Sequence, residues 1–171
     1  LITKDGQHTS AIFGFLNSIF KLIRDEKPDY LAIVLDSKAK TFRHDLFTEY
    51  KANREKMPEE LAGQLSPLYE IIKDMNIPLI ALPGYEADDL IGTIAKKAET
   101  KDFVTYIVTG DKDMMQLVSD KVFVYSPGNR FKSTTIYDND KVKERWGIVP
   151  SQFIDYLAMV GDSSDNIPGV N

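Results

Sequence analysis

Carboxylates are the side chains of this sequence whose type and spacing could do chemistry, and their densest group follows residue 84. Glu86, Asp88 and Asp89 lie where the apolar run 77–82 ends in Pro-Gly and a helical apolar pattern begins. One acid in the first turn of a helix commonly serves as a cap. Three acids so close together repel one another, and a bound divalent cation explains them better than capping alone.

Two other apolar runs also end in acids. Asp36 follows residues 30–35, and Asp111 and Asp113 follow residues 103–108. Continuous apolar runs predict strands that are buried on both faces of a parallel sheet. Ligand sites of open α/β sheets lie at the carboxyl ends of their strands, so we expect these acids to meet at one edge. A calcium loop at residues 111–113 is disfavoured because the further ligands of an EF-hand are missing.

A fourth acidic group, Asp162 and Asp165, lies three residues apart in a small, polar stretch with turn-forming residues. A plain surface loop would account for this stretch. As a cluster near the other acids, it could instead complete a cage of oxygen ligands.

The composition limits the kinds of site that this chain can build. With 171 residues, of which 43% are hydrophobic and 27% charged, the chain is long enough for one domain with a core. It has no cysteine and two histidines, so a metal site must use oxygen ligands, which suit Mg²⁺, Mn²⁺ or Ca²⁺. No apolar run has membrane-spanning length and no signal peptide is evident, which fits a cytoplasmic protein.

Charge alone argues mildly against nucleic-acid binding, because the net charge is -5. The balance changes to +3 if the eight acids named above are set aside as metal ligands.

Residues 37–57 form a basic stretch with interleaved aromatic residues. The basic residues are Lys38, Lys40, Arg43, Lys51, Arg54 and Lys56, against the acids Asp45, Glu49 and Glu55. Basic side chains neutralise phosphates and aromatic rings stack on bases, so the stretch could bind DNA. Lys51 and Arg54 are three residues apart and would share one face of a helix. The alternative is a solvated surface segment held by salt bridges.

The remaining patterns predict the elements that position these residues. Helices are expected from Thr9 or Ser10, with an apolar face in the core, and after Pro58, Asp138 and Pro150. Strands are expected at residues 122–125 and 134–137. Alternation of strands and helices predicts the α/β class.

Four motifs, in this order, are similar to those of one known family. They are YKANR at 50–54, GYEADD at 84–89, TGDKDM at 109–114 and MVGDSSDNIPG at 159–169. The whole chain resembles the 5′-nuclease domain at the amino end of bacterial DNA polymerase I, which is related to the flap endonucleases. The resemblance implies a PIN-like (Rossmann-like), twisted, mostly parallel sheet with flanking helices and a helical arch.

The resemblance also implies roles for individual residues. Two divalent ions, Mg²⁺ or Mn²⁺, are implied, with the first surrounded by Asp36, Glu86, Asp88 and Asp111. The second ion would be held by Asp113, Asp162 and Asp165, with Asp89 in an outer or structural position. Lys51 and Arg54 would contact the scissile phosphate, Tyr50 would stack near the displaced nucleotide, and Arg43 would add a DNA contact.

By the same resemblance, the domain spans residues 1–171, with the arch at 37–57 and the start of a helix-hairpin-helix region at 161–171. The first strand of the family, with a further metal-binding Asp, would precede Leu1, and this chain alone is expected to bind metal weakly and to lack turnover. The implied activity is a structure-specific 5′-3′ exonuclease or flap endonuclease for primer removal and repair. Its partner would be DNA with a 5′ flap, nick or free 5′ end, and the protein would be monomeric, with a polymerase domain as a possible fusion.

Three other functions use the same features. One is a PIN-like ribonuclease, which comparison of matched RNA and flap DNA substrates would reveal. Another is a catalytically silent DNA-binding relative, against which the complete set of acids argues. The third is a Mg²⁺ phosphatase for other substrates, which would leave the basic aromatic stretch without a purpose.

Overall fold

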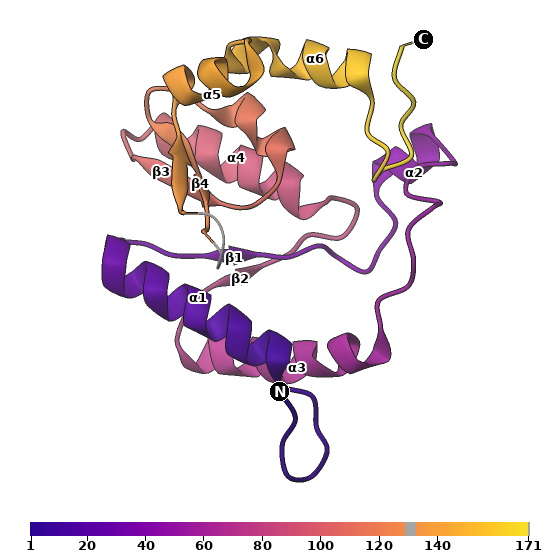
Figure 1. Cartoon of the computed structure of the whole chain (residues 1–171), viewed down its shortest axis with the longest axis vertical. Helices are drawn as coiled ribbons and strands as arrows, with labels where there is room; N and C mark the ends of the chain where they lie inside the picture. The colour runs from indigo at the N-terminus through magenta and orange to yellow at the C-terminus, as the bar shows by residue number, and fades with distance from the viewer. Residues whose placement is uncertain (129–132, 171) are drawn as a thin grey trace. The chain divides into compact units, whose positions relative to one another are not determined.

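Contacts divide the chain into two units, each with its own core. The computed structural model describes residues 1–128 and 133–170. The first unit comprises Leu1–Leu35 and Glu55–Ala81, and the second comprises Asp36–Arg54 and Leu82–Asn171. Figure 1 follows the chain through them. Every candidate site residue named above belongs to the second unit. The single domain predicted over 1–171 stays a prediction, and residue 171 lies outside the described residues.

The first unit joins two helices and a pair of parallel strands. Helix α1 spans Ser10–Glu26 and α3 spans Glu59–Asp74, while β1 (Ile33–Val34) pairs with β2 (Leu79–Ile80). Its buried core consists of Leu68, Ile72 and Ile77, and the helical spacing of α1 brings apolar side chains onto them. Those that pack from α1 are Ile12, Phe15, Leu16 and Ile19.

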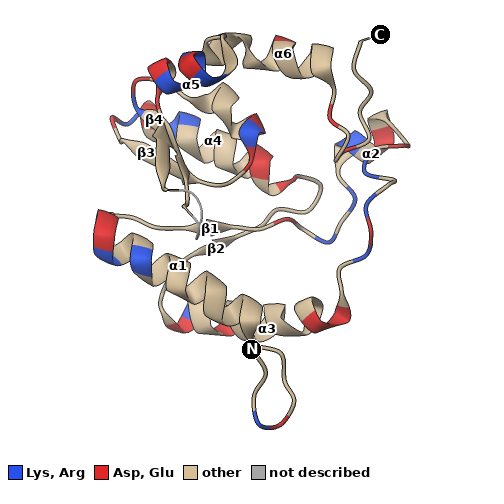
Figure 2. Ribbon diagram, viewed as in Figure 1, with Lys and Arg blue, Asp and Glu red and all other residues tan. Residues whose placement is uncertain are grey.

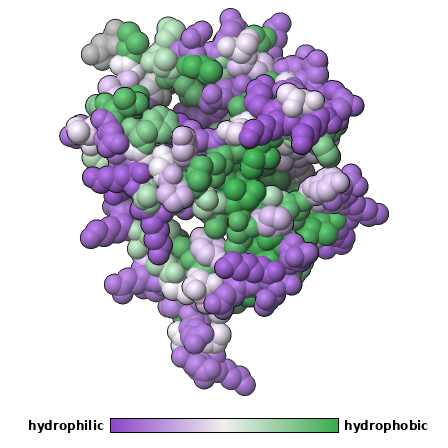
Figure 3. All heavy atoms as spheres, turned by 180° about the vertical axis from the view of Figure 1, so that it is seen from behind, coloured by the Kyte–Doolittle hydropathy of each residue, from purple (hydrophilic) through white to green (hydrophobic). Residues whose placement is uncertain are grey.

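Only part of the apolar face predicted for α1 is buried. Phe13 is 59% exposed and Phe20 is 50% exposed, although both were expected in the core. The apolar residues of α1 span too wide an arc for the face that packs on α3, so some of them stay at the surface. Exposed apolar side chains are also visible as green atoms in Figure 3.

The second unit is built on a three-stranded mixed sheet. Strand β3 (Thr105–Val108) pairs in parallel with β4 (Val122–Ser126), which pairs in antiparallel with β5 (Thr135–Tyr137). Val122 and Val124 of β4 are fully buried, because β-branched side chains pack well on a central strand.

Within the described ranges, helical segments make up the remaining regular structure of the second unit. They are α2 (Phe42–Leu46), α4 (Ala87–Glu99), the 3₁₀ helix η1 (Lys112–Leu117), α5 (Asn139–Trp146), η2 (Pro150–Gln152) and α6 (Phe153–Val160). Phe153 is fully buried and meets the Trp146 ring edge-on at 5.4 Å between centroids. Met114 and Met115 of η1 also lie in the core, which fixes the start of η1 next to β3.

The α/β class is confirmed, but the strands differ from the sequence prediction in length and burial. The runs 30–35, 77–82 and 103–108 give strands of two, two and four residues. In β3 only one face is buried, since Ile107 is 4% exposed while Tyr106 is 51% and Val108 is 44% exposed. Among the described residues the strands form two sheets, one parallel and one mixed, rather than one mostly parallel sheet. No helix in the described ranges is long and apolar enough to cross a membrane.

Candidate active site

The loop before α4 sets the position of the densest acidic group. Gly84 has a φ of +87°, a conformation that glycine adopts without strain, and it turns the chain after β2. Glu86 then serves as the N-cap of α4, and its backbone N–H donates to Asp89 Oδ2 at 3.0 Å. Two of the three acids therefore take part in capping α4, since Glu86 occupies the N-cap position and the Asp89 side chain accepts its N–H. Figure 2 shows the acids at this end of α4.

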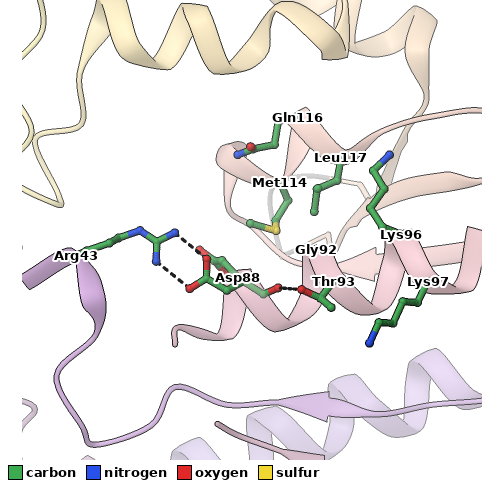
Figure 4. A pocket seen from close by; sticks show the side chains of 10 residues that line it. Arg43, Asp88, Gly92, Thr93, Lys96, Lys97, Met114, Gln116 and Leu117 are labelled. Carbon is green, nitrogen blue, oxygen red and sulfur yellow. Dashed lines mark hydrogen bonds and ion pairs between the residues drawn. The ribbon is translucent and has the colours of Figure 1, made fainter. Parts of the chain in front are cut away.

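Asp89 is also the partner of Arg43. Arg43 donates from Nη1 and Nη2 to the two oxygens of Asp89 at 2.8 and 2.7 Å, a bidentate geometry that is strong for this pair. The hydrogen bonds from Arg43 hold the pKa of Asp89 below its usual value, and Asp89 in turn raises the pKa of Arg43. Figure 4 shows Arg43 reaching from α2 to α4, at the edge of a pocket of about 540 Å³. The pair therefore anchors α2, and the DNA contact expected of Arg43 stays a prediction.

Glu86 is buried and surrounded by donors. It is 8% exposed and accepts a hydrogen bond from Lys51 Nζ at 2.6 Å, while the Tyr50 hydroxyl lies 2.9 Å from its Oε2. A buried carboxylate needs such partners because its desolvation is costly. The basic segment thus supplies a cation directly to an acid of the site.

Asp165 receives a second set of donors from the same segment. Arg54 Nη2 lies 2.5 Å from Asp165 Oδ1, the Tyr50 hydroxyl lies 3.0 Å from Oδ2, and Lys51 Nζ lies 3.8 Å from Oδ2. Residues 50–54 and the acids Glu86 and Asp165 therefore meet, although they are far apart in the sequence. The structure thus brings these two acids together with Lys51 and Arg54, while the predicted contacts with phosphate and metal stay predictions.

Lys51 and Arg54 do not lie on a helix, contrary to the sequence prediction. Helix α2 ends at Leu46, residues 48–53 form turns, and Lys51 has a φ of +56°. The turn is stabilised from outside, since the backbone N–H of Lys51 donates to the backbone oxygen of Asp165 at 3.0 Å. The two side chains still reach the same carboxylate, because the turn brings them together instead of a helical face.

Tyr50 is placed to orient carboxylates in this structure. Its side chain is 6% exposed, and its ring meets the edge of His44 at 5.3 Å. Burial and the neighbouring Glu86 and Asp165 raise the pKa of Tyr50, so the hydroxyl remains a donor. A ring this deeply buried offers little surface to a nucleotide, and the predicted stacking role stays untested.

Asp36 and Asp111 lie close enough to Asp88 to raise its pKa. Desolvation raises the pKa of Asp88, and the charges of Asp111, Asp36 and Glu86 raise it further. Asp36 Oδ1 accepts a hydrogen bond from the Ala87 N–H at 2.8 Å, which ties Asp36 to the start of α4. Asp111 caps η1 by accepting the Asp113 N–H at 2.9 Å. Three acids from three segments thus share one repulsive environment.

Asp113 has an oxygen that no group of the described residues satisfies. Its Oδ1 is buried and has no hydrogen-bond partner. Burial, reinforced by Asp111, Asp162 and Asp165, raises the pKa of Asp113 to about 6. Asp162 is better supported, because Ser164 donates to its Oδ1 from both N–H and Oγ and lowers its pKa. The unsatisfied oxygen of Asp113 is the group that a cation could best satisfy.

A tight loop holds Asp162 and Asp165 in place. Asp162 and Ile167 pair through two backbone hydrogen bonds of 2.9 and 2.8 Å. Gly161 has a φ of +74°, and a Cβ on it would lie 2.4 Å from the Gly169 nitrogen. Only glycine fits this close approach of backbone to backbone.

The donor set fits divalent cations in its chemistry, but the acids are not arranged as one ligand cluster. All candidate ligands are carboxylates, burial and neighbouring acids raise the pKa values of Asp88 and Asp113, and Asp113 Oδ1 is unsatisfied. Among the described residues, however, no group of three acids or histidines is close enough to hold an ion as the side chains stand. Glu86 and Asp165 are instead occupied by Lys51, Arg54 and Tyr50. Side-chain rotation would be needed to form the predicted ligand sets.

Sequence reasoning missed three polar residues that support the site. Ser164 holds Asp162, while Asn53 and Asn166 donate across to backbone oxygens of Ser163 and Glu49. The Asp-x-Ser spacing at 162–164 is typical of a turn in which the acid accepts local donors, and it could have indicated the first of these contacts. The other two join segments more than 100 residues apart, and no local pattern indicates them.

The chain is similar in sequence to known proteins over nearly all of its length. The family model of the 5′-3′ exonuclease, N-terminal resolvase-like domain, matches residues 1–147. The chain belongs to this family. It is 44% identical over 170 residues to a 5′-3′ exonuclease of Aquifex aeolicus, covering 99% of the chain and 57% of that relative. It is 42% identical over 171 residues to DNA polymerase I of Bacillus subtilis, covering 99% of the chain and 19% of that relative. The chain therefore spans about a fifth to just over half of the length of these relatives.

Solved structures confirm the predicted fold. The T5 D15 protein co-crystallised with metal ions matches 94% of the chain with a TM-score of 0.74 at 26% identity, over 63% of that protein. T5 5′-exonuclease with bound zinc matches 96% of the chain with a TM-score of 0.73 at 24% identity, over 68% of that protein. The 5′-exonuclease of T5 thus shares the fold of this chain.

Proposed function

We propose that the intact protein is a divalent-metal-dependent 5′ nuclease, which hydrolyses phosphodiester bonds at 5′ ends or flaps of duplex DNA. The observation that carries the proposal is the meeting of two cationic side chains with acids from four segments of the second unit. Lys51 and Arg54 contact Glu86 and Asp165, and burial together with neighbouring acids raises the pKa values of Asp88 and Asp113. Family membership and the exonucleases among the relatives support the reaction class.

The acids are the residues that would hold the metal. We assign Asp36, Glu86, Asp88 and Asp111 to one Mg²⁺ or Mn²⁺, and Asp113, Asp162 and Asp165 to a second. Bound cations would supply an activated water and stabilise the charge of the leaving oxygen. The solved T5 structures were obtained with metal ions, which supports a divalent metal and leaves its identity and number to experiment.

Lys51 and Arg54 supply positive charge to the phosphate. In the structure they neutralise Glu86 and Asp165, and a DNA phosphate would compete for the same cations. Charge grows on the phosphoryl oxygens as the bond breaks, so donors fixed at this point lower the barrier. Tyr50 keeps its proton and orients the two carboxylates from behind. The assignment explains why a basic segment folds against an acidic site.

The substrate is expected to be recognised by shape. Phosphate contacts position a protein on DNA but read no sequence, and the cations of this site are suited to phosphates. The flap or nick, the monomeric state, a fused polymerase domain and a cytoplasmic location are parts of the same proposal. A T5 flap endonuclease complex contains DNA and metal ions, which supports DNA as the partner.

A cleavage assay with three substrates tests the proposal. The intact protein is incubated with Mg²⁺ and either 5′-flap DNA, nicked duplex DNA or RNA of the flap shape. We expect cleavage of the DNA substrates and none in the double variant Asp111→Asn with Asp113→Asn, while DNA binding survives. Asp140→Asn, an exposed acid in the first turn of α5, is the matched control and should cleave as the wild type does. Mg²⁺-dependent cleavage by the double variant refutes the site, and preference for RNA favours a ribonuclease.

A further inference from the structure

Two turns that are far apart in the sequence exchange hydrogen bonds in both directions. Asn53 Nδ2 donates to the backbone oxygen of Ser163 at 2.8 Å, and Asn166 Nδ2 donates to the backbone oxygen of Glu49 at 2.8 Å. Between them, the Lys51 N–H donates to the Asp165 oxygen at 3.0 Å. Each turn therefore supplies one asparagine amide to the other, and we call Asn53 and Asn166 the asparagine clasp.

The backbone at the clasp shows that the contact shapes both turns. Lys51 has a φ of +56° and Asn166 has a φ of +60°, values that are unfavourable for most residues and tolerated best by asparagine and glycine. Lys51 is neither, so its conformation must be stabilised by what it contacts. The Lys51 N–H donates to the backbone oxygen of Asp165, and its Nζ donates to Glu86. Asn53, two residues after Lys51, donates to the backbone oxygen of Ser163.

Without the clasp, the segment that carries the two cations would be held only by its own turn hydrogen bonds, the Lys51 N–H bond to Asp165 and the contacts of Tyr50 and the two cationic side chains. Arg54 is half-exposed, with 51% of its side chain accessible, and it directly follows the turns at residues 48–53 rather than lying on a helix. A long side chain on such a turn samples many rotamers, and holding it costs conformational entropy. The clasp restricts the backbone on both sides of the contact, so that Lys51 and Arg54 start from positions next to Glu86 and Asp165.

We infer that Asn53 and Asn166 are positioning residues of the proposed nuclease, which hold residues 49–54 against the 162–167 turn and so place Lys51 and Arg54 over the acids. This inference rests on the proposed function for its catalytic consequence, but the clasp itself can be measured without cleavage. Neither amide contacts a candidate metal ligand side chain, so the role differs from that of the acids.

Three variants remove the clasp with little other disturbance. Asn166→Gly keeps the positive φ and removes the amide, and Asn53→Ala removes the other donor. Asn53→Asp keeps the shape but points a carboxylate at the Ser163 oxygen, so it should be at least as harmful as Asn53→Ala. Asn76→Gly is the matched control, because Asn76 has a φ of +58° and follows α3 in the first unit.

Hydrogen exchange of the Lys51 amide is the readout that does not depend on activity. It is measured in the intact metal-free protein, with thermal melting to confirm that each variant is folded. We expect Lys51 exchange to become about five- to tenfold faster in Asn53→Ala and in Asn166→Gly, and to stay unchanged in Asn76→Gly. Wild-type exchange in both clasp variants would overturn the inference.

Single-turnover cleavage of flap DNA then separates positioning from DNA binding. We expect both clasp variants to lower the maximal rate about five- to tenfold with little change in the DNA concentration at half-saturation. If Asn53→Ala weakens only DNA binding and Asn166→Gly has no effect, Asn53 is a DNA contact and the inference is wrong. If the wild type cleaves no substrate, the proposed function fails, whereas the exchange measurement still decides whether the clasp exists.

Discussion

Asp113 and Glu86 show two ways in which single carboxylates are accommodated in the site. Glu86 is buried with Lys51 and Tyr50 as partners, whereas Asp113 has a buried oxygen without a partner and a pKa raised to about 6. A paired carboxylate stabilises the fold, and an unpaired one among other acids destabilises it. The site therefore retains strain at Asp113 that a bound cation would relieve.

The raised pKa of Asp113 predicts that replacing this acid by a neutral residue stabilises the protein at high pH but not at low pH. Because its folded pKa, about 6, exceeds the unfolded value of 3.8, ionisation opposes folding above pH 6, and this cost is absent below the unfolded pKa. We expect Asp113→Asn to raise the melting temperature of the metal-free protein at pH 8 and to leave it unchanged near pH 3.5. Asp140→Asn serves as the control. A destabilised variant at pH 8 would show that Asp113 is satisfied in solution.

Lys51 is predicted to matter more for turnover than for DNA affinity. Its ammonium group lies 2.6 Å from Glu86 in a mostly buried contact, so it is already placed where a phosphate would meet the acids. Lys51→Ala should lower kcat by about a hundredfold or more, with a much smaller change in the dissociation constant for flap DNA. Binding and single-turnover assays in the intact protein measure both. A loss confined to affinity would show that Lys51 only tethers DNA.

The sequence was enough to predict which side chains are candidates for chemistry, but not which of them bond to one another. Residue type and position after apolar runs identified the acids, since both are local properties. The bond from Arg43 to Asp89 spans 46 positions, and it depends on how α2 folds against α4. No local pattern could show that Asp89 would be satisfied by an arginine and a cap.

At the scale of elements, the loop at residues 161–169 is the most constrained part of the site. Gly161 combines a φ of +74° with backbone neighbours that a Cβ would meet at 2.4 to 2.6 Å. The loop carries Asp162 and Asp165, so any shift of this loop moves two candidate ligands.

Gly161→Ala is predicted to destabilise the protein and to weaken the site. We expect a loss of more than about 1 kcal/mol in the free energy of unfolding, because backbone atoms cannot move aside as a flexible side chain could. Gly14→Ala is a control for which the opposite change is expected. Gly14 lies inside α1, and a Cβ added to it would have no atom within 4 Å, so alanine should raise the free energy of unfolding by about 0.5–1 kcal/mol. Chemical denaturation measures both changes. Equal stability of wild type and Gly161→Ala would contradict the strain assigned to the loop.

Element prediction succeeded where the period of the pattern was clear. The apolar spacing after Glu86 gave α4, and the run at 103–108 gave β3. It failed at Lys51 and Arg54, whose spacing suggested a helix, whereas residues 48–53 form turns in the structure. The conformation there is set by contacts with the 162–167 turn, which propensity cannot anticipate.

At the scale of the whole molecule, the candidate site is confined to one of the two units. The second unit contains every acid and base of the site, whereas the first contributes its own apolar core. The site can therefore be analysed within the second unit alone. A net charge of -5 on the chain is compatible with DNA binding because the acids are gathered at the site, where bound cations would neutralise them.

The most direct test is a crystal of the intact protein soaked in Mn²⁺, with the metal located by its anomalous scattering. The account predicts manganese bound by oxygens of Asp88 and Asp111 and of Asp113 and Asp162, with Lys51 moved away from Glu86. Manganese bound only elsewhere, or none bound while these acids keep the partners seen here, would contradict it.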